Sequence, residues 1–197
     1  MSKRIIIMAR PAELGKVKSR LAATLGAEKT LTVYKHLLQH TISTAEKSGH
    51  SIIIWWSELP NDYLIIPHKL QIGELLGDRM HQAFEFEFNL NQSEKVVMIG
   101  TDCPDLTTTI LEEAFNALEE NNVVLGPSED GGYYLIGMNG FHPELLQEIE
   151  WSTEKVLAQT IEKCKKYKKT FALLPTLNDI DNEEDLRRSS LIKTLVL

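Results

Sequence analysis

Short runs of consecutive apolar residues alternate with stretches in which apolar residues recur every three or four positions. The first pattern is typical of buried strands and the second of amphipathic helices. The runs predict strands over residues 3–9, 51–56, 69–72, 95–100, 123–126, 133–137 and 170–174. The periodic stretches predict helices over residues 27–47, 77–90, 110–120, 143–149 and 153–166, and a last one from about residue 182. This alternation predicts one α/β domain over residues 1–197, a three-layer α/β/α sandwich around a mostly parallel mixed sheet.

The most informative run is the apolar segment 96–99, which stops at Gly100 and is followed by Asp102. Four consecutive apolar residues predict a strand that is buried on both faces, as in parallel sheets. Pro104 then turns the chain toward a helix. Asp102 is therefore predicted just beyond the carboxyl end of a central strand, where open α/β sheets bind their ligands. A carboxylate there favours a divalent metal, Mg²⁺ or Mn²⁺, that holds a nucleotide.

A basic loop follows the first predicted strand directly, in a chain whose net charge is −7. Arg10 begins this loop, and Gly15 allows a turn in which backbone N–H groups face an anion. Lys18 and Arg20 are spaced to lie on one side of an extended segment, so we expect both to face a phosphate. The alternative is a solvated basic surface, which we expect for Lys16.

The loop at 127–132 contains a second candidate acid, Asp130, followed by Gly131 and Gly132. Paired glycines permit positive φ or the close approach of a ligand to the backbone. Because Asp130 also follows a predicted strand, we expect it to be a second metal ligand beside Asp102. The alternative is an ordinary turn aspartate, which is common before glycines.

Two other segments have both a structural and a ligand-binding interpretation. Asp78 opens the helix predicted at 77–90 and is expected to cap it. Arg79 follows in the first turn, where it opposes the helix dipole, so its cation is expected to have another partner, such as an anionic ligand. Asp179 and Asp181 form an acidic cluster at a strand end, or begin a capped helix.

Composition and missing motifs exclude several functions. The acidic net charge argues against nucleic-acid binding. No apolar stretch approaches the roughly 20 residues that a membrane helix needs, or forms a signal-peptide core, so the expected location is the cytoplasm. The two cysteines lack the spacing of a zinc site. A Walker A motif, a GxGxxG motif and the GxSxG motif of serine hydrolases are also missing.

Six segments together resemble the DUF2064 family of glycosyltransferase-A-like transferases, which are associated with radical SAM and selenodomain systems. In chain order they are RPAELGKVKSRLAATLG, GELLGDRMHQAF, VVMIGTDCPDL, VVLGPSEDGGYYLIG, WSTEKVL and DIDNEEDL. The resemblance implies a nucleotide-diphospho-sugar transferase fold. It also implies that Asp102 is the metal-binding aspartate, Lys18 and Arg20 are phosphate-binding cations, and Asp130 is a second acidic ligand.

The resembling segments leave the reaction open. They contain further substrate-binding candidates, namely Tyr133, Trp151, Ser152 and Thr153, although Ser152 is also expected to cap a helix. Glycosyltransferase-A enzymes commonly use Asp-x-Asp, whereas residues 102–105 are Asp-Cys-Pro-Asp. This spacing looks more like the single strand-end aspartate of nucleotidyltransferases. The chain is likewise similar to 2-phospholactate guanylyltransferase, which shares the basic loop and the strand-end aspartate.

Three functions follow from the sequence. The first is a metal-dependent transferase that moves a sugar from a nucleotide diphosphate to an unknown small acceptor, with Asp130 or Glu154 as base. The second is a nucleotidyltransferase that joins an NTP to a phosphorylated or carboxylated acceptor. The third is a non-catalytic nucleotide-binding module. Two strand-end acids beside a cationic loop favour an enzyme. The sequence leaves the oligomeric state undetermined.

Overall fold

The structure, a computed structural model, describes residues 2–60 and 65–193. Within these residues the strands are β1 (Lys3–Ala9), β2 (Ser51–Trp56), β3 (His68–Leu70), β4 (Lys95–Ile99), β5 (Val123–Pro127), β6 (Tyr133–Met138) and β7 (Phe171–Leu173). The α-helices are α1 (Ser19–Leu25), α2 (Ala27–Lys47), α3 (Leu76–Glu85), α4 (Thr108–Ala117), α5 (Val156–Lys166) and α6 (Glu183–Arg188). A π-helix, η1 (Phe86–Leu90), and two 3₁₀ helices, η2 (Pro143–Leu145) and η3 (Ser190–Lys193), complete the set.

The strands form one sheet in the order β3-β2-β1-β4-β6-β5-β7. Strands β3, β2, β1 and β4 pair in parallel, and so do β5 and β7. Strand β6 runs antiparallel to both of its neighbours, β4 and β5. The predicted mostly parallel mixed sheet is therefore confirmed. Because β1, β4 and β5 point the same way, their carboxyl ends meet at one edge of the sheet.

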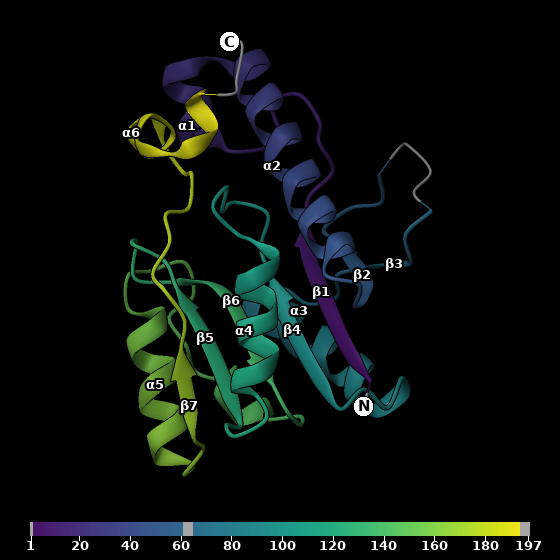
Figure 1. Cartoon of the computed structure of the whole chain (residues 1–197). Coiled ribbons are helices and arrows are strands. Elements are labelled where there is room, and N and C mark those ends of the chain that lie inside the picture. The colour runs from purple at the N-terminus through teal and green to yellow at the C-terminus, as the bar shows by residue number, and fades with distance from the viewer. Residues whose placement is uncertain (1, 61–64, 194–197) are drawn as a thin grey trace.

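Helices cover both faces of the sheet, as Figure 1 shows. Alternate side chains of β1 enter two separate cores, as the alternation of a strand requires. Ile5 and Ile7 pack on one face with residues of α2 and α4 such as Phe115. Ile6 packs on the opposite face with residues of α3 such as Phe84, and α5 lies on this same face. The predicted three-layer α/β/α arrangement is thus confirmed.

A third, smaller core lies above the carboxyl edge of the sheet, where α1 and α6 lie beside α2 (Figure 1). Its buried members are Leu21, Val33, Leu37, Ile180 and Leu186. Asn182 caps α6 by accepting hydrogen bonds from the backbone N–H groups of two residues in its first turn. This core holds α6 against α1 and α2.

Several predicted helices are corrected by the structure. Helix α1 begins within the segment predicted as a basic loop. The helix predicted at 77–90 ends at Glu85 and continues as the π-helix η1. Only one 3₁₀ turn forms within 143–149. The helix predicted at 153–166 begins at Val156, because Ser152 lies in a left-handed turn (φ 63°) and does not cap it.

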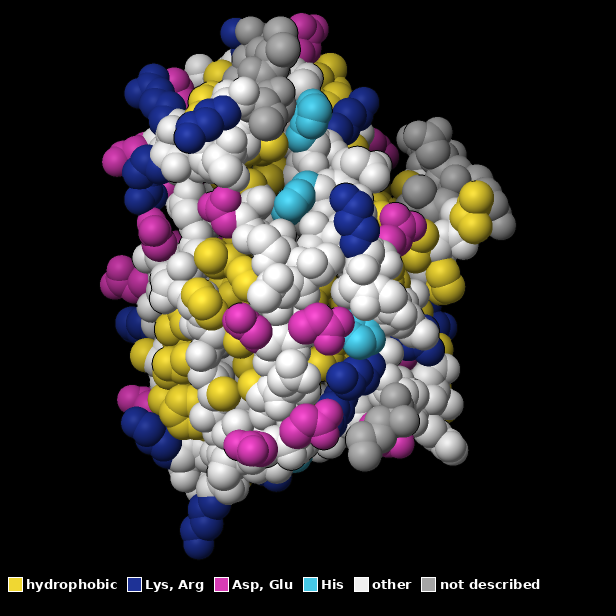
Figure 2. Space-filling view, in the orientation of Figure 1, with side chains coloured by type: hydrophobic (Ala, Val, Ile, Leu, Met, Phe, Trp, Pro, Cys, Tyr) yellow, Lys and Arg dark blue, Asp and Glu magenta, His cyan; other side chains and the backbone are white. Residues whose placement is uncertain are grey.

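On the face formed by α2 and α4, Lys and Arg side chains are interspersed with Asp and Glu (Figure 2). Within residues 2–60 and 65–193, no helix is both long and apolar enough to cross a membrane. A separate group of charged residues lies at the carboxyl edge of the sheet.

Candidate active site

The loops that follow β1, β4 and β5 meet at the carboxyl edge of the sheet, and a segment from the end of the chain crosses beside them. In this segment, 177–182, the Ile180 backbone N–H donates a hydrogen bond to the Asp102 carbonyl oxygen (2.9 Å). That contact joins residues far apart in the sequence. It brings Asp179 and Asp181 to the strand-end Asp102.

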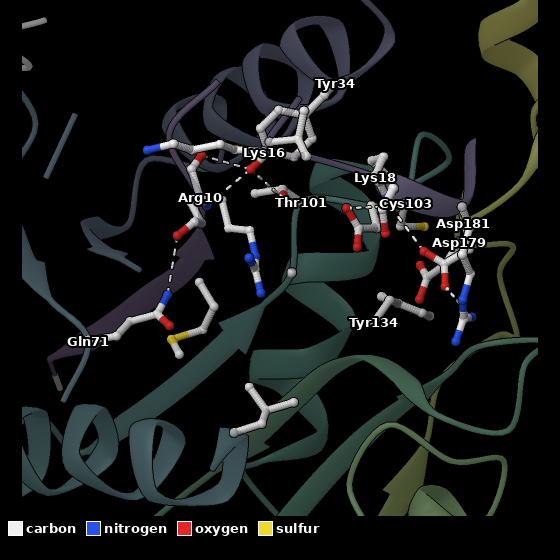
Figure 3. A pocket seen from close by; sticks show the side chains of 18 of the residues that line it. Arg10, Lys16, Lys18, Tyr34, Gln71, Thr101, Cys103, Tyr134, Asp179 and Asp181 are labelled. Atoms are coloured by element: carbon white, nitrogen blue, oxygen red, sulfur yellow. Dashed lines mark hydrogen bonds and ion pairs between the residues drawn. The ribbon is translucent and has the colours of Figure 1, made fainter. Parts of the chain in front are cut away.

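Lys18 lies at the centre of this acidic group. Its Nζ is 2.7 Å from Asp102 Oδ1 and 3.3 Å from Asp181 Oδ1, and only 5% of its side chain is exposed. Burial alone would lower the pKa of Lys18, but the two carboxylates raise it above its usual value, so the ammonium group stays charged. Figure 3 shows Lys18 on the same side of the pocket as Asp179 and Asp181. The protein thus holds a cation beside the predicted metal ligand.

Arg20 reaches the same acidic group from a different position than predicted. Lys18 has a left-handed backbone (φ 48°) and precedes α1, so Lys18 and Arg20 do not lie along one extended segment. The Arg20 guanidinium is 3.5 Å from Asp181 Oδ2, and 76% of its side chain is exposed. The two cations still converge on Asp181, because α1 starts directly above the strand ends.

Asp179 was predicted only as part of an acidic cluster or of a capped helix, without a role of its own. Its Oδ1 is buried and has no hydrogen-bond partner among the described residues. The pKa of Asp179 is raised to about 7, chiefly by burial and then by the nearby charges of Asp102 and Asp130, which outweigh the lowering by Lys18. A buried carboxylate with a free oxygen favours the binding of a cation at this position. The signal in the sequence was the acidic pair that flanks Ile180.

The start of the basic loop is fixed by Tyr34 on α2. The Tyr34 hydroxyl donates to the Arg10 carbonyl (2.8 Å) and accepts from the Arg10 backbone N–H (3.0 Å) and from the Thr101 hydroxyl (3.5 Å). Gln71 holds the neighbouring strand ends by donating to the carbonyls of Ala9 (3.2 Å) and Trp55 (2.7 Å). The Arg10 guanidinium forms no ion pair with any described residue, and it lines the pocket shown in Figure 3.

The loop after β5 holds Asp130 by one oxygen. Asp130 Oδ1 accepts hydrogen bonds from the Ser128 hydroxyl (2.5 Å) and from the Gly132 backbone N–H (2.9 Å). Gly132 lines the cleft described below, but Gly131 does not. Gly131 has φ 87°, and a side chain there would collide with the backbone of Glu154, so its role is to let the two loops pack.

A turn at 151–154 lies beside this loop. Trp151 packs where Gly77 of α3 lacks a side chain, since a Cβ on Gly77 would collide with the indole. The Tyr133 and Trp151 rings are nearly perpendicular, at 87°, with centroids 6.4 Å apart. The Thr153 hydroxyl donates to the Glu150 carbonyl (2.7 Å). These contacts fix an aromatic wall at the carboxyl edge.

Two adjoining hollows, of about 550 and 700 Å³, form one cleft along this edge. They share a border that includes Arg10, Arg20, Asp102, Asp179 and Asp181. The smaller hollow, which we call the cationic half, adds Gly15, Lys16, Lys18 and Arg79. The larger hollow, the acidic half, adds Asp130, Gly132, Trp151, Ser152, Thr153 and Glu154, while Tyr133 belongs to the border. The cleft thus has one half with additional cations and one half with additional carboxylates.

The remaining cations of the cationic half are also bound to protein oxygens. The Lys16 ammonium contacts the carboxylates of Glu13 (2.9 Å) and Glu58 (3.1 Å), and its side chain is 55% exposed. Arg79 Nε donates to the Gly73 carbonyl (3.0 Å), in the loop before its own helix. Arg79 thus has a backbone partner and also lines the cleft, and the anionic ligand expected for it stays a prediction.

The donor chemistry of the border fits a divalent metal. Asp102 and Asp179 offer carboxylate oxygens, one of which is buried and without a partner among the described residues. Mg²⁺ prefers such oxygens and commonly takes only one or two carboxylates, with phosphate and water as its other ligands. Within the described residues, no three Asp, Glu, His or Cys side chains converge as a complete metal site. A metal held here therefore needs ligands from a bound substrate.

The comparison with protein families decides which family the chain belongs to. A family model described as an uncharacterized protein conserved in bacteria, DUF2064, matches residues 32–153. The chain belongs to the DUF2064 family. The match covers more than half of the chain and includes Asp102 and Asp130. The DUF2064 resemblance seen in the six sequence segments is confirmed.

Solved structures are similar to this DUF2064 chain over nearly its whole length. A candidate nucleotide-diphospho-sugar transferase from Desulfovibrio desulfuricans G20 is 29% identical, with a TM-score of 0.90 over 98% of this chain and 95% of that chain. This likeness to a transferase, over nearly the whole of both chains, confirms the predicted class of enzyme.

Two more distant structures share the fold alone. One is Rv0371c of Mycobacterium tuberculosis H37Rv in complex with manganese, at 11% identity and a TM-score of 0.57, covering 99% of this chain and 100% of that chain. The other is CMP:2-keto-3-deoxy-manno-octonic acid synthetase complexed with CTP, at the same identity, TM-score and coverage.

Proposed function

We propose that this DUF2064 protein is a metal-dependent glycosyltransferase that takes a sugar from a nucleotide diphosphate. The observation that supports the proposal best is the division of the cleft at Asp102. Cations lie on one side of this strand-end carboxylate, and carboxylates with an aromatic wall lie on the other. The 29% identical relative is a candidate nucleotide-diphospho-sugar transferase, which supports the same class of donor.

In this proposal the cationic half binds the diphosphate. The Lys18 ammonium exchanges its contacts with Asp102 and Asp181 for phosphate oxygens, and Arg10 and Arg20 add guanidinium donors. A divalent metal held by Asp102 and Asp179 would neutralise the charge that develops on the leaving diphosphate. Without such compensation a diphosphate would lie against these carboxylates.

The acidic half then holds the acceptor. The acceptor oxygen forms a bond to the anomeric carbon of the sugar as the bond between that carbon and the phosphate oxygen breaks. The electron pair of the broken bond leaves with the nucleoside diphosphate. Asp130 accepts the acceptor proton through Oδ2, because its Oδ1 is held by Ser128 and Gly132. Glu154 lines the same half and binds the acceptor.

Nucleotidyl transfer is the second candidate, and one contact favours it. Asp105, the second acid of the Asp-Cys-Pro-Asp segment, accepts a hydrogen bond from the Ser190 hydroxyl (2.6 Å) and does not line the cleft. Asp102 is therefore the sole cleft residue of that pair. In this reaction an acceptor attacks the α-phosphorus of an NTP, and pyrophosphate leaves.

The decisive experiment is a thermal-shift screen of NTPs and sugar nucleotides, each with and without Mn²⁺, followed by product analysis. A ligand at a hundred times its dissociation constant should stabilise the protein by about 2.7 kcal/mol. We expect Mn²⁺-dependent stabilisation by a sugar nucleotide, followed by release of the nucleoside diphosphate. Stabilisation by an NTP with release of pyrophosphate would select the second candidate, and binding without any turnover would indicate a binding module.

Two variants make this experiment specific. Asp102→Asn should abolish the Mn²⁺-dependent shift and lower kcat/KM by roughly a hundred- to a thousandfold, the loss typical of removing one electrostatic contact to the transition state. Asp105→Asn is the matched control, because Asp105 lies three residues away and outside the cleft. Equal losses in both variants would contradict the proposed role of Asp102.

A further inference from the structure

The two halves of the cleft differ in the charged side chains that line only one of them. Those of the cationic half are cations, and those of the acidic half are carboxylates. The charged residues that line only the acidic half are Asp130 and Glu154. Among the described residues, the Lys and Arg side chains that line it are Arg10 and Arg20, which also line the cationic half. Arg20 is already paired with Asp181. Arg10 forms no ion pair with any described residue, but in the proposed function it binds the donor diphosphate. The acidic half then has no further cation for a second anionic ligand.

The acidic half also has an apolar side. Met80, Ile136 and Val156 line it together with the Tyr133 and Trp151 rings. The Tyr133 hydroxyl is buried, so Tyr133 offers its ring rather than a polar group to the hollow. The Trp151 indole is held in place by its packing against Gly77. Aromatic faces of this kind bind flat apolar surfaces, such as the C–H face of a sugar ring.

The polar groups of the acidic half are hydrogen-bond acceptors. Glu154 is exposed, and its carboxylate has no hydrogen bond or ion pair with any described residue. Asp130 has the same freedom at Oδ2, because both of its hydrogen bonds go to Oδ1. Ionised carboxylates accept hydrogen bonds from hydroxyl and ammonium groups, and they repel phosphates and carboxylates.

We propose that the acceptor is a polyhydroxylated compound, neutral or amine-bearing, that contains no phosphate or carboxylate group. Its hydroxyl or amino groups bind Asp130 and Glu154, and its C–H face lies on Trp151. This assignment rests on the proposed function, since it takes the cationic half as the donor site. A phosphorylated acceptor would instead place its phosphate beside the Glu154 carboxylate and the unpartnered Oδ2 of Asp130.

The test uses matched acceptors that differ only in charge. The wild-type protein is loaded with Mn²⁺ and whichever of UDP, GDP, CDP or ADP stabilises it in the thermal-shift screen. Binding of glucose, glucosamine, glucose 6-phosphate and glucuronate is then measured by saturation-transfer NMR and calorimetry. We expect glucose or glucosamine to bind at least about tenfold more tightly than either anion, a difference of 1.4 kcal/mol. Tighter binding of an anion, or no binding of either uncharged or amine-bearing sugar at millimolar concentration, overturns the assignment.

A charge-reversal variant tests whether the carboxylates cause the preference. Glu154→Lys should shift the ratio of glucose to glucose 6-phosphate affinity toward the phosphate by about tenfold. The matched control is Glu162→Lys, which makes the same change in net charge on the exposed side of α5, outside the cleft. Both variants are checked by thermal unfolding. An unchanged ratio in folded Glu154→Lys, or an equal shift in Glu162→Lys, overturns the assignment.

The two proposals fail in different ways. If no nucleotide stabilises the protein in an Asp102-dependent manner, the proposed function fails and the acceptor assignment fails with it. If a nucleotide does so but the anionic acceptors bind best, only the acceptor assignment fails.

Discussion

The two halves of the cleft lie side by side on the same strand ends. The charged side chains that line only the cationic half are paired, whereas those that line only the acidic half are unpaired at one oxygen or more. In the cationic half, Lys18, Lys16 and Arg79 are all bound to carboxylates or carbonyls of the protein. In the acidic half, Glu154 and one oxygen of Asp130 have no partner among the described residues. In the proposed function, a ligand of the cationic half would therefore replace oxygen partners that the cations already have. A ligand of the acidic half would supply partners that the carboxylates lack.

This difference has a physical consequence for how each half selects its ligand. When a cation is already paired, binding a phosphate gains only the difference in free energy between its old and its new oxygen contacts. Its advantage is that the side chain is already ordered, as in the nearly buried Lys18. A free carboxylate loses more water when a ligand binds, but it rejects anions strongly. Binding strength and selectivity are thus expected to come from different halves.

Among the residues that line the cationic half alone, the largest expected effect comes from Lys18→Gln, which removes the buried cation. Donor affinity should fall by roughly thirtyfold, because a hydrogen bond from a charged group contributes about 2 kcal/mol. Asp102 and Asp181 also lose their shared cation, so the metal-free protein should unfold more easily, and Mn²⁺ should restore part of the loss. Donor titrations and thermal unfolding with and without Mn²⁺ measure both effects.

The control for this prediction is Lys16→Gln in the same loop. Lys16 also contacts two carboxylates, but it is more than half exposed, and exposed ion pairs contribute little to stability. We expect a change of at most a few-fold in donor affinity. Equal effects of the two substitutions would mean that burial does not distinguish these lysines.

The border between the halves is tested by Asp179→Asn. The pKa of Asp179 is raised from 3.8 to about 7 in the folded protein, so the unfolded chain releases this proton at lower pH than the folded one. The metal-free protein should therefore lose stability as the pH rises from about 4 through about 7. Asp179→Asn should remove that loss and be more stable than wild type at pH 8 by roughly 2 kcal/mol. Chemical unfolding from pH 4 to 8 measures the difference.

The same variant also sharpens the assignment of the metal ligands. Asp179→Asn should lower the stabilisation that Mn²⁺ gives in the presence of nucleotide, although it raises the stability of the metal-free protein. Asp181→Asn is the matched comparison, because Asp181 is part exposed and paired with Lys18 and Arg20. A gain of stability at pH 8 in both variants would contradict the special position of Asp179.

The smallest expected effect comes from Arg79→Gln. The guanidinium is held by the Gly73 carbonyl, and Arg79 is only partly buried, so its loss should weaken donor binding by only a few-fold, or roughly 0.5–1 kcal/mol. Acceptor affinity should not change, because Arg79 lines the cationic half alone. A larger loss of acceptor than of donor affinity, in the same calorimetric titrations, would contradict the division of the cleft.

The sequence predicted the sheet and the position of Asp102 because both depend on local patterns. The apolar run of β4 and the break at Gly100 are sufficient to place an aspartate at the end of a buried strand. The same reasoning placed Asp130 after β5 and predicted a helix from Asn182. The helix limits were less well predicted at Ser152, because its left-handed backbone depends on the packing of the turn rather than on its residue type.

Only the tertiary structure decided which charged residues meet. The Lys18 side chain is buried because α1 begins at the strand ends. The Asp179 Oδ1 is buried because Ile180 is hydrogen-bonded to Asp102, far away in the sequence. The division of the cleft likewise depends on how the turn at Trp151 packs on Gly77. Periodicity records which side of an element is apolar, and it holds no information on which distant loops share a space. Those contacts are set by the packing of the layers.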